Sequence, residues 1–318
     1  MLKSDDIYFY DFDLNLVHIL PSFGADKGYI SMNVQKDFND SGSLEIVFID
    51  SKLKSIIKEH KDNLIVIWKG FQGFLTGHQF NRQCRAMGMS LNGLLHRIVI
   101  PKTVTVLNGT VEALARSAIA SNAPWLSLGE EKGFETSVDY STDTYKTADK
   151  YIQELLSLDN AGFEIYADIP NKQYVFQVLK SRESELMLSK NNLNAYDFVE
   201  NYSNKNVAYG GWYEKEQSGN SDPVWTYITT DETLAGINVI DTVLSSKNEG
   251  EALQELKSKV AELEIDLKTK KVQYGVDYSI GDIVRVQNDD IATKKKIIGV
   301  IMSKEKGFTE NPILSEVE

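Results

Sequence analysis

The stretch Tyr274-Gly275-Val276-Asp277-Tyr278-Ser279-Ile280-Gly281-Asp282-Ile283-Val284-Arg285-Val286 and the later run Lys296-Ile297-Ile298-Gly299-Val300-Ile301-Met302 decide the fold. Both contain apolar runs rich in β-branched residues, the connector from Gln287 to Lys295 is polar, and glycines lie on both sides of it. This pattern predicts a hairpin on a curved sheet. We interpret it as the hairpin that closes a small β-barrel.

Predicted strands and turns alternate along the first 105 residues. The strands are Ile7–Tyr10, Val17–Leu20, Tyr29–Val34, Ser43–Ile49, Leu64–Trp68, Gly73–Thr76 and Gln83–Ser90, and a short helix is expected from Ser51 to His60. Many short strands with turn residues between them favour a twisted antiparallel sheet or barrel over alternating βαβ units. We therefore expect a first β-barrel domain over residues 1–105.

A middle α+β segment is expected over residues 106–206. Thr110 can cap a helix that continues to Ala120, and a second helix is expected from Thr147 to Leu158. Strands are predicted at Phe163–Ala167 and Gln173–Leu179. The polar residues from Ser181 to Asn206 indicate loops mixed with short elements.

Residues 207–318 are expected to form a second β-barrel domain with one long helix. Strands are predicted at Val207–Tyr213, Val224–Thr230 and Pro312–Leu314, in addition to the hairpin. The helix is predicted over residues 249–270, where Leu253, Leu256, Val260, Leu263 and Leu267 follow heptad spacing. About two heptads fit either a helix laid on the adjoining sheet or a seam between chains.

A weak internal repeat supports this division. The run Phe71-Gln72-Gly73-Phe74-Leu75-Thr76 matches Ile297-Ile298-Gly299-Val300-Ile301-Met302 in pattern. Gly73 and Gly299 occupy the same place in the two runs, where a bend or close packing leaves no space for a side chain. The sequence therefore predicts an α+β, β-rich chain with two small related β-barrel domains and an α+β insertion between them.

Composition and charge exclude several classes of protein. The chain has 318 residues, of which 42% are hydrophobic and only six are proline, as in a globular protein. Its net charge of -12 argues against nucleic-acid binding, which needs clustered lysine and arginine. The single cysteine, Cys84, excludes an intrachain disulfide and a thiolate metal cluster, which fits assembly in a reducing cytoplasm. We expect neither a signal peptide at Met1–Asp6 nor a membrane-spanning segment.

Three stretches resemble ligand-binding sites, and each has a simpler structural interpretation. Gly70, Gly73 and Gly77 have the glycine content of a phosphate loop, but no Gly-Lys-Ser/Thr follows and the setting is strand to strand. Asp11 and Asp13 would share one face of a strand and can chelate a cation, although a strand edge and turn is the preferred interpretation. The run Asn288-Asp289-Asp290 lacks the spaced oxygen ligands of a calcium loop.

The remaining chemically active residues are scattered. His18, His60, His78 and His96 form no zinc motif, and no Gly-x-Ser-x-Gly marks a serine nucleophile. Cys84, near Met87 and Met89, is expected in a core or barrel wall rather than as a nucleophile. The tryptophans can form a sugar platform or serve as core residues, and they are Trp68, Trp125, Trp212 and Trp225. Paired carboxylates in so acidic a chain leave glycosidase geometry open, but none stands out. We therefore expect no catalytic, cofactor-binding or metal-ligating residues and no enzyme.

Four ordered motifs resemble those of the phage tail hub family, the siphophage tail-tip proteins akin to the baseplate hub of contractile tails. They are Asp40-Ser41-Gly42-Ser43-Leu44-Glu45-Ile46, Gly70-Phe71-Gln72-Gly73-Phe74-Leu75-Thr76, Ser90-Leu91-Asn92-Gly93-Leu94-Leu95-His96-Arg97-Ile98-Val99, and Tyr274-Gly275-Val276-Asp277-Tyr278 with Gly281-Asp282-Ile283-Val284. The resemblance runs nearly end to end, and its specificity lies in the order and spacing of short, glycine-rich motifs.

The resemblance implies a structural role in a virion tail or a phage-like particle such as a tailocin. Proteins of this family form homotrimers at the distal end of the tail tube, where two barrels in each chain adapt a trimer to a hexameric ring. It implies a tail tube or distal ring protein above this chain and a tip, fibre or spike protein below it. Longer members carry a peptidoglycan hydrolase or fibre region after the hub, which we do not expect here. The alternative is a cell-wall-acting or carbohydrate-binding tail protein.

Overall fold

The computed structural model divides the chain into two compact units. Unit 1 comprises Met1–Ala195 with Leu267–Glu318, and unit 2 comprises Tyr196–Asp266. The structure describes residues 5–22, 28–61, 63–81, 83–103, 105–189, 191–200, 207–212, 224–229, 241–244, 263–269, 272–287, 292–305 and 307–317. None of the helices within these ranges is long and apolar enough to cross a membrane.

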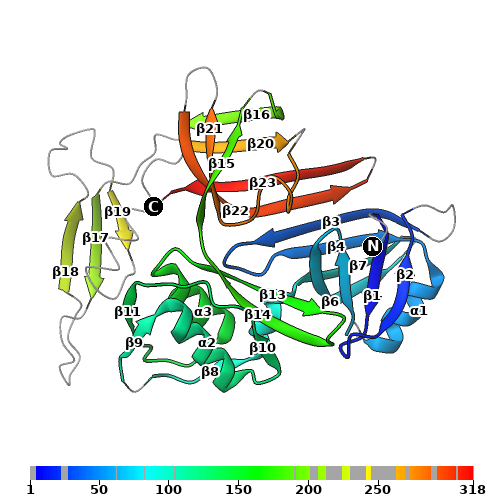
Figure 1. The fold of residues 1–318 in the computed structure, drawn as a ribbon, viewed down its shortest axis with the longest axis horizontal. Helices are drawn as coiled ribbons and strands as arrows, with labels where there is room; N and C mark the ends of the chain where they lie inside the picture. The colour runs from blue at the N-terminus through cyan, green and yellow to red at the C-terminus, as the bar shows by residue number, and fades with distance from the viewer. Residues whose placement is uncertain are drawn as a thin grey trace. The chain divides into compact units, whose positions relative to one another are not determined.

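One large sheet brings the two ends of the sequence together in unit 1 (Figure 1). Its strands, in spatial order, are β15 (Arg182–Leu188), β21 (Asp282–Gln287), β22 (Ala292–Lys304), β3 (Tyr29–Asp37), β4 (Ser43–Phe48), β7 (Cys84–Ser90), β6 (Phe71–Phe80), β5 (Ile65–Trp68), β1 (Ile7–Tyr10) and β2 (Leu16–Leu20), and β23 (Phe308–Glu316) pairs with β22. The β-rich fold, the hairpin β21–β22 and the N-terminal strands are confirmed. Among the described residues the two ends of this sheet do not pair, so the two closed barrels are not confirmed.

β22 is the strand that joins the N-terminal and C-terminal strands. Its first half pairs with β21, from Ala292 to Lys296, and its second half pairs with β3, from Gly299 to Lys304. On the other side it pairs with β23, and that register shifts between Ile297 and Gly299. A bulge re-aims the backbone of a strand. Accordingly, Ile297 O accepts from Gly281 N at 2.7 Å and the next carbonyl, Ile298 O, accepts from Phe38 N at 2.7 Å.

Phe38, one residue beyond β3, fills the corner made by this change of partner. Its carbonyl accepts from Phe163 N at 2.9 Å, and the side chain is 4% exposed. A Cβ at Gly162 would lie 2.1 Å from Phe38 O, and one at Gly281 would lie 2.7 Å from the Phe38 ring. Gly281 also has a φ of +98°, which side chains rarely adopt. Glycine is therefore required on both sides of Phe38.

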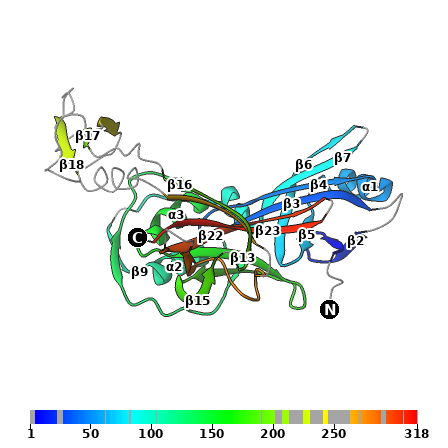
Figure 2. The same cartoon turned by 90° about the horizontal axis from the view of Figure 1, so that it is seen from above.

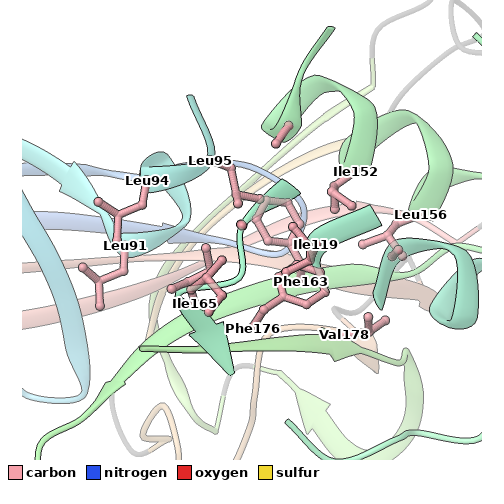
Figure 3. Close-up of a cluster of buried hydrophobic side chains, with 14 of the residues drawn as sticks. Leu91, Leu94, Leu95, Ile119, Ile152, Leu156, Phe163, Ile165, Phe176 and Val178 are labelled. Atoms are coloured by element: carbon pink, nitrogen blue, oxygen red, sulfur yellow. The ribbon is translucent and has the colours of Figure 1, made fainter. Parts of the chain in front are cut away.

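A helical layer covers the sheet formed by β10 (Leu126–Leu128), β14 (Gln173–Leu179) and β13 (Gly162–Asp168). The layer contains α2 (Val111–Asn122), α3 (Ala148–Ser157) and the 3₁₀ helix η1 (Leu91–Arg97). Both predicted helices are confirmed, and Thr110 Oγ1 caps α2 by accepting from Ala113 N at 3.1 Å. Figure 3 shows their apolar side chains, including Ile119 and Ile152, meeting Phe163 and Phe176 of the sheet. Two short ladders complete this part: β8 (Val99–Ile100) with β12 (Lys146–Thr147), and β9 (Leu107–Thr110) with β11 (Ser137–Tyr140).

A second core lies on the other face of the N-terminal strands. Ile7 and Phe9 of β1 belong to it, whereas Tyr8 and Tyr10 belong to the core under the helices. Side chains alternate across a strand, so this part of the sheet separates two cores. The predicted helix α1 (Ser51–His60) is confirmed and contributes Leu53 and Ile57 to the second core.

The long helix predicted over residues 249–270 is wrong at its C-terminal end. β20 (Leu263–Thr269) is a strand, and its sequence Leu-Glu-Ile-Asp-Leu-Lys-Thr alternates apolar and polar residues with a period of two. Leu263 and Leu267 fit heptad spacing equally well, and the heptad interpretation overlooked the alternation. Residues 249–262 lie outside the described residues.

The loops mixed with short elements that were expected over residues 181–206 include two strands where the structure describes them. β15 and β16 (Leu193–Glu200) are strands of seven and eight residues. β15 has charged residues at three of its first four positions, and it obtains its place through parallel pairing with β21. β16 pairs with β20.

Unit 2 contains a three-stranded sheet. It consists of β18 (Val224–Thr229), β17 (Val207–Trp212) and β19 (Asp241–Leu244), and the first two are the predicted strands. The expected domains 1–105, 106–206 and 207–318 stay a prediction. The compact units are bounded elsewhere because the pairing of β22 with β3 places the C-terminal strands in the sheet of the N-terminal ones.

Gly281→Ala is expected to lower the free energy of unfolding by about 2–4 kcal/mol, because it combines backbone strain with a clash against Phe38. Gly275→Ala is the matched control, since Gly275 has a φ of +76° but no atom within 4 Å of an added Cβ. It should cost only about 1–2 kcal/mol, the backbone strain alone. Urea unfolding followed by tryptophan fluorescence measures both, and equal losses would contradict the packing argument.

Candidate functional site

Three of the four motifs that carry the family resemblance meet around one turn, which we call the 38–42 turn (Phe38 to Gly42). Gly42 N donates to Ser90 Oγ at 3.1 Å, and Ser90 N donates to Gly42 O at 3.0 Å. Gly281 lies against Phe38. Residues more than 200 positions apart in the sequence therefore contribute to one structural site.

Asn92 at the start of η1 connects the 38–42 turn to β13. Its side-chain Nδ2 donates to Asp40 O at 2.9 Å and to Phe163 O at 3.1 Å, and its Oδ1 accepts from Ile165 N at 2.7 Å. The residue is 4% exposed. A buried amide that satisfies three backbone groups fixes their relative positions, because leaving any of them unpaired is costly.

A second polar cluster joins β3, β13 and the C-terminal strands. Lys36 Nζ lies 2.5 Å from Glu164 Oε1 and 5.6 Å from the centre of the Tyr274 ring. Glu310 Oε1 accepts from the Tyr278 hydroxyl at 2.9 Å and also from Tyr274 N. The cluster therefore connects the segment Tyr274–Tyr278 to both β3 and β23.

Burial and charge set the protonation of this cluster. Burial lowers the pKa of Lys36, but Glu164 and Tyr274 outweigh it, so the pKa of Lys36 lies above its ordinary value. Burial raises the pKa of Tyr278, and the Glu310 carboxylate raises it further. Lys36 is therefore a cation and Tyr278 a neutral donor at neutral pH. Their chemistry is that of hydrogen bonding and ion pairing rather than of proton transfer.

Ser41, His96 and Asp149 come together beside the 38–42 turn, a set that sequence reasoning missed. His96 Nε2 lies 3.1 Å from Asp149 Oδ2 and 3.5 Å from Ser41 Oγ. In a serine nucleophile triad the carboxylate binds one ring nitrogen and the serine binds the other. Here both contacts involve Nε2, so the histidine cannot relay a proton between the two groups in this arrangement.

The ligand sites considered from the sequence have structural roles where the structure describes them. Asp11 accepts from Asn15 N at 2.8 Å and closes the turn between β1 and β2. Burial raises the pKa of Asp11, but the hydrogen bonds from Asn15 outweigh burial and hold that pKa below its usual value. Asp13 is exposed in the same turn. Among the described residues, no three His, Cys, Asp or Glu side chains are grouped to hold a metal ion. Asn288-Asp289-Asp290 lies outside the described residues.

The three strand glycines belong to the β5–β6 turn and to β6. Gly70 has a φ of +81°, as that turn requires. The expected close packing at the paired glycines is confirmed, because a Cβ at Gly73 would lie 2.5 Å from Met89 O and one at Gly299 would lie 2.9 Å from Lys36 O.

The four histidines do not form one site. His18 Nε2 lies 3.6 Å from Asp50 Oδ2, and burial lowers the pKa of His18 although Asp50 opposes the shift. His60 ends α1, and His78 stacks on Phe80 with ring centres 4.4 Å apart. With His96 beside Asp149, each histidine contacts a different part of unit 1.

The cysteine and the tryptophans also lie in different parts of the structure. Cys84 packs partly buried against the second core, as expected. Trp68 is 1% exposed and cannot form part of a sugar platform, whereas Trp125 is 47% exposed and contacts Tyr174 edge to face. Trp212 and Trp225 lie in β17 and β18.

Comparison with known proteins finds likeness in structure only. No protein-family model and no curated protein matches the sequence. The structure is similar to the 43 kDa tail protein of prophage MuSo2 from Shewanella oneidensis, with 11% identity, a TM-score of 0.60 and 98% of both chains covered. It is also similar to the tail protein from Neisseria meningitidis MC58, with 15% identity, a TM-score of 0.61 and coverage of 98% and 97%. Prophage tail protein gp18 from Listeria monocytogenes EGD-e gives 14% identity, a TM-score of 0.56 and coverage of 98% and 95%.

The chain has the fold of a phage tail protein. The resemblance inferred from the four motifs is confirmed at this level. In this tail-protein fold Gly42, Asn92 and Gly281, from three of the four motifs, lie at the 38–42 turn. The Lys36–Glu164 pair was missed, because each residue lies in an alternating strand and nothing in the local sequence indicates that the two meet.

Asn92→Leu is expected to lower the free energy of unfolding by about 2–4 kcal/mol, because Asp40 O, Phe163 O and Ile165 N lose their partner. Asn171→Ala is the control, since Asn171 is exposed and bonds only to Asp168. It should cost less than about 1 kcal/mol. Hydrogen exchange gives a local readout, with faster exchange of the Ile165 amide in the Leu variant. Unchanged exchange at Ile165 would contradict the bridging role.

Lys36→Met is expected to cost about 2–4 kcal/mol, because it leaves the Glu164 carboxylate without its partner in a largely buried site. Lys294→Met removes the exposed ion pair with Glu183 and should cost at most about 0.5 kcal/mol. Chemical unfolding of Lys36→Met, Glu164→Gln and Lys36→Met/Glu164→Gln beside the unmodified chain completes a double-mutant cycle. Additive losses in the cycle would show that the pair is not coupled.

Proposed function

We propose that the chain is a structural tail hub protein of a phage tail or phage-like particle. In this proposal three chains form a ring that joins the hexameric tail tube to the distal tip. The observation that carries it is the extent of the structural likeness, which covers 98% of this chain and 95–98% of three tail proteins. The tail-protein fold therefore accounts for almost the whole chain.

The proposal includes two related barrels in each chain, so that a trimer would present six similar surfaces to a hexameric ring. The change of partner along β22 supports this arrangement. One edge of β22 serves β21 and then β3, as expected of a strand shared by two adjoining sheets. The expected domains 1–105, 106–206 and 207–318 belong to the same proposal.

The polar residues of unit 1 support an assembly role. The polar side chains around the 38–42 turn bind backbone groups or each other, which holds the surface in one shape. A net charge of -12 would also keep a tube-end ring from binding DNA that passes through it. The proposed partners are a tube or distal ring protein above and a tip, fibre or spike protein below, with assembly in the host cytoplasm.

Light scattering of the purified chain at micromolar concentration tests the ring, and the expected mass is three times that of one chain. Negative-stain images of the chain mixed with its tube protein should show it capping one end of the tubes. A monomer that caps no tube would contradict the proposal. Release of wall fragments by the chain, abolished by a single carboxylate substitution, would favour a cell-wall-acting tail protein instead.

A further inference from the structure

A basic surface lies on α1 of this acidic chain. Residues 51–61 contain four lysines, at positions 52, 54, 58 and 61, and one glutamate, Glu59. The whole chain contains 46 acidic residues and 34 lysines and arginines. The local charge of this helix is therefore opposite to that of the protein.

The β6–β7 hairpin runs toward the side of the sheet where α1 lies (Figure 2), and Phe80 at the end of β6 extends this surface. Phe80 lies under two of the lysines, with Lys54 Nζ at 5.2 Å and Lys58 Nζ at 5.7 Å from its ring centre. The His78 ring stacks on the Phe80 ring. Cation–π contacts at these distances favour positions of Lys54 and Lys58 over the ring, by about 0.5–1 kcal/mol each at an exposed site. Lys58 and Lys61 are exposed. We call Lys54, Lys58, Lys61, His78 and Phe80 the α1 platform.

Ring symmetry limits what the platform can contact. A ring of three identical chains is built from heterologous contacts, in which one surface of a chain meets a different surface of the next. Two chains of net charge -12 repel each other at long range, and a contact that brings opposite charges together locally offsets this repulsion. A basic surface facing the acidic remainder of a neighbouring chain provides such a contact.

We propose that the α1 platform is one half of the contact between copies of this chain, and that its occupant is an acidic surface of a second copy. This inference rests on the proposed ring and adds to it the surface and the force that close it. Because the lysines are exposed, salt should weaken the contact.

Lys58→Glu/Lys61→Glu tests the platform, with Lys102→Glu/Lys132→Glu as a control that makes the same change of charge at two other exposed lysines. Analytical ultracentrifugation measures trimer dissociation at about 50 mM and about 500 mM salt. The platform variant should raise the dissociation constant at least about tenfold at low salt, and the control less than about twofold. Lys58→Gln/Lys61→Gln should lie between them, and high salt should reduce the differences. Circular dichroism and thermal unfolding check that the overall fold of each variant is unchanged.

The outcomes separate this inference from the ring itself. If the wild type forms a trimer and the platform variant forms it with the same affinity, the inference is overturned and the proposed ring still stands. A wild-type chain that stays monomeric up to about 100 µM overturns the inference, and if it also caps no tube it overturns the ring as well. If the variant assembles normally but loses binding to purified cell walls, the platform faces an anionic wall polymer, and the inference is again overturned.

Discussion

The backbone of Phe38 is the point on which unit 1 depends. Its N–H donates to Ile298 O and its C=O accepts from Phe163 N, so both groups are used by segments far away in the sequence. Leaving either group buried without a partner would cost about 1–3 kcal/mol. The end of β3, the start of β13 and the middle of β22 must therefore meet at one place. Contacts this distant in the sequence are slow to form, so this corner is expected to close late in folding.

Polar side chains reinforce that corner. Asn92 fixes the turn after β3 against β13, and the Lys36–Glu164 pair does the same from β3 itself. Such groups favour one arrangement because any shift would leave one of them unpaired in a site of low dielectric. In unit 1 these polar side chains therefore determine shape. That use of polarity differs from an active site, where charged groups converge on a space that a substrate can enter.

Local patterns in the sequence predicted the local structure well. The three helices, with Thr110 capping α2, and the β21–β22 hairpin follow from periodicity and capping residues. Prediction failed where two periods fit the same residues, as at Leu263 and Leu267, and where a polar strand such as β15 depends on its partner for its place. Gly42, Asn92 and Gly281 were visible in motifs, but their meeting at the turn from Phe38 to Gly42 was not, because contacts between residues so far apart in the sequence leave no local signal.

The charge of the chain has different consequences at different scales. As a sum, a net charge of -12 argues against non-specific binding to DNA phosphates, and it also makes copies of the chain repel each other at long range. Repulsion between distant, exposed charges is screened beyond about 8–10 Å at physiological salt, whereas charges in contact are screened much less. Association of an acidic chain with itself is therefore decided by the few groups that touch. In unit 1 Lys58 and Lys61 of the α1 platform are placed to be such groups, since they are exposed and opposite in sign to the net charge of the chain.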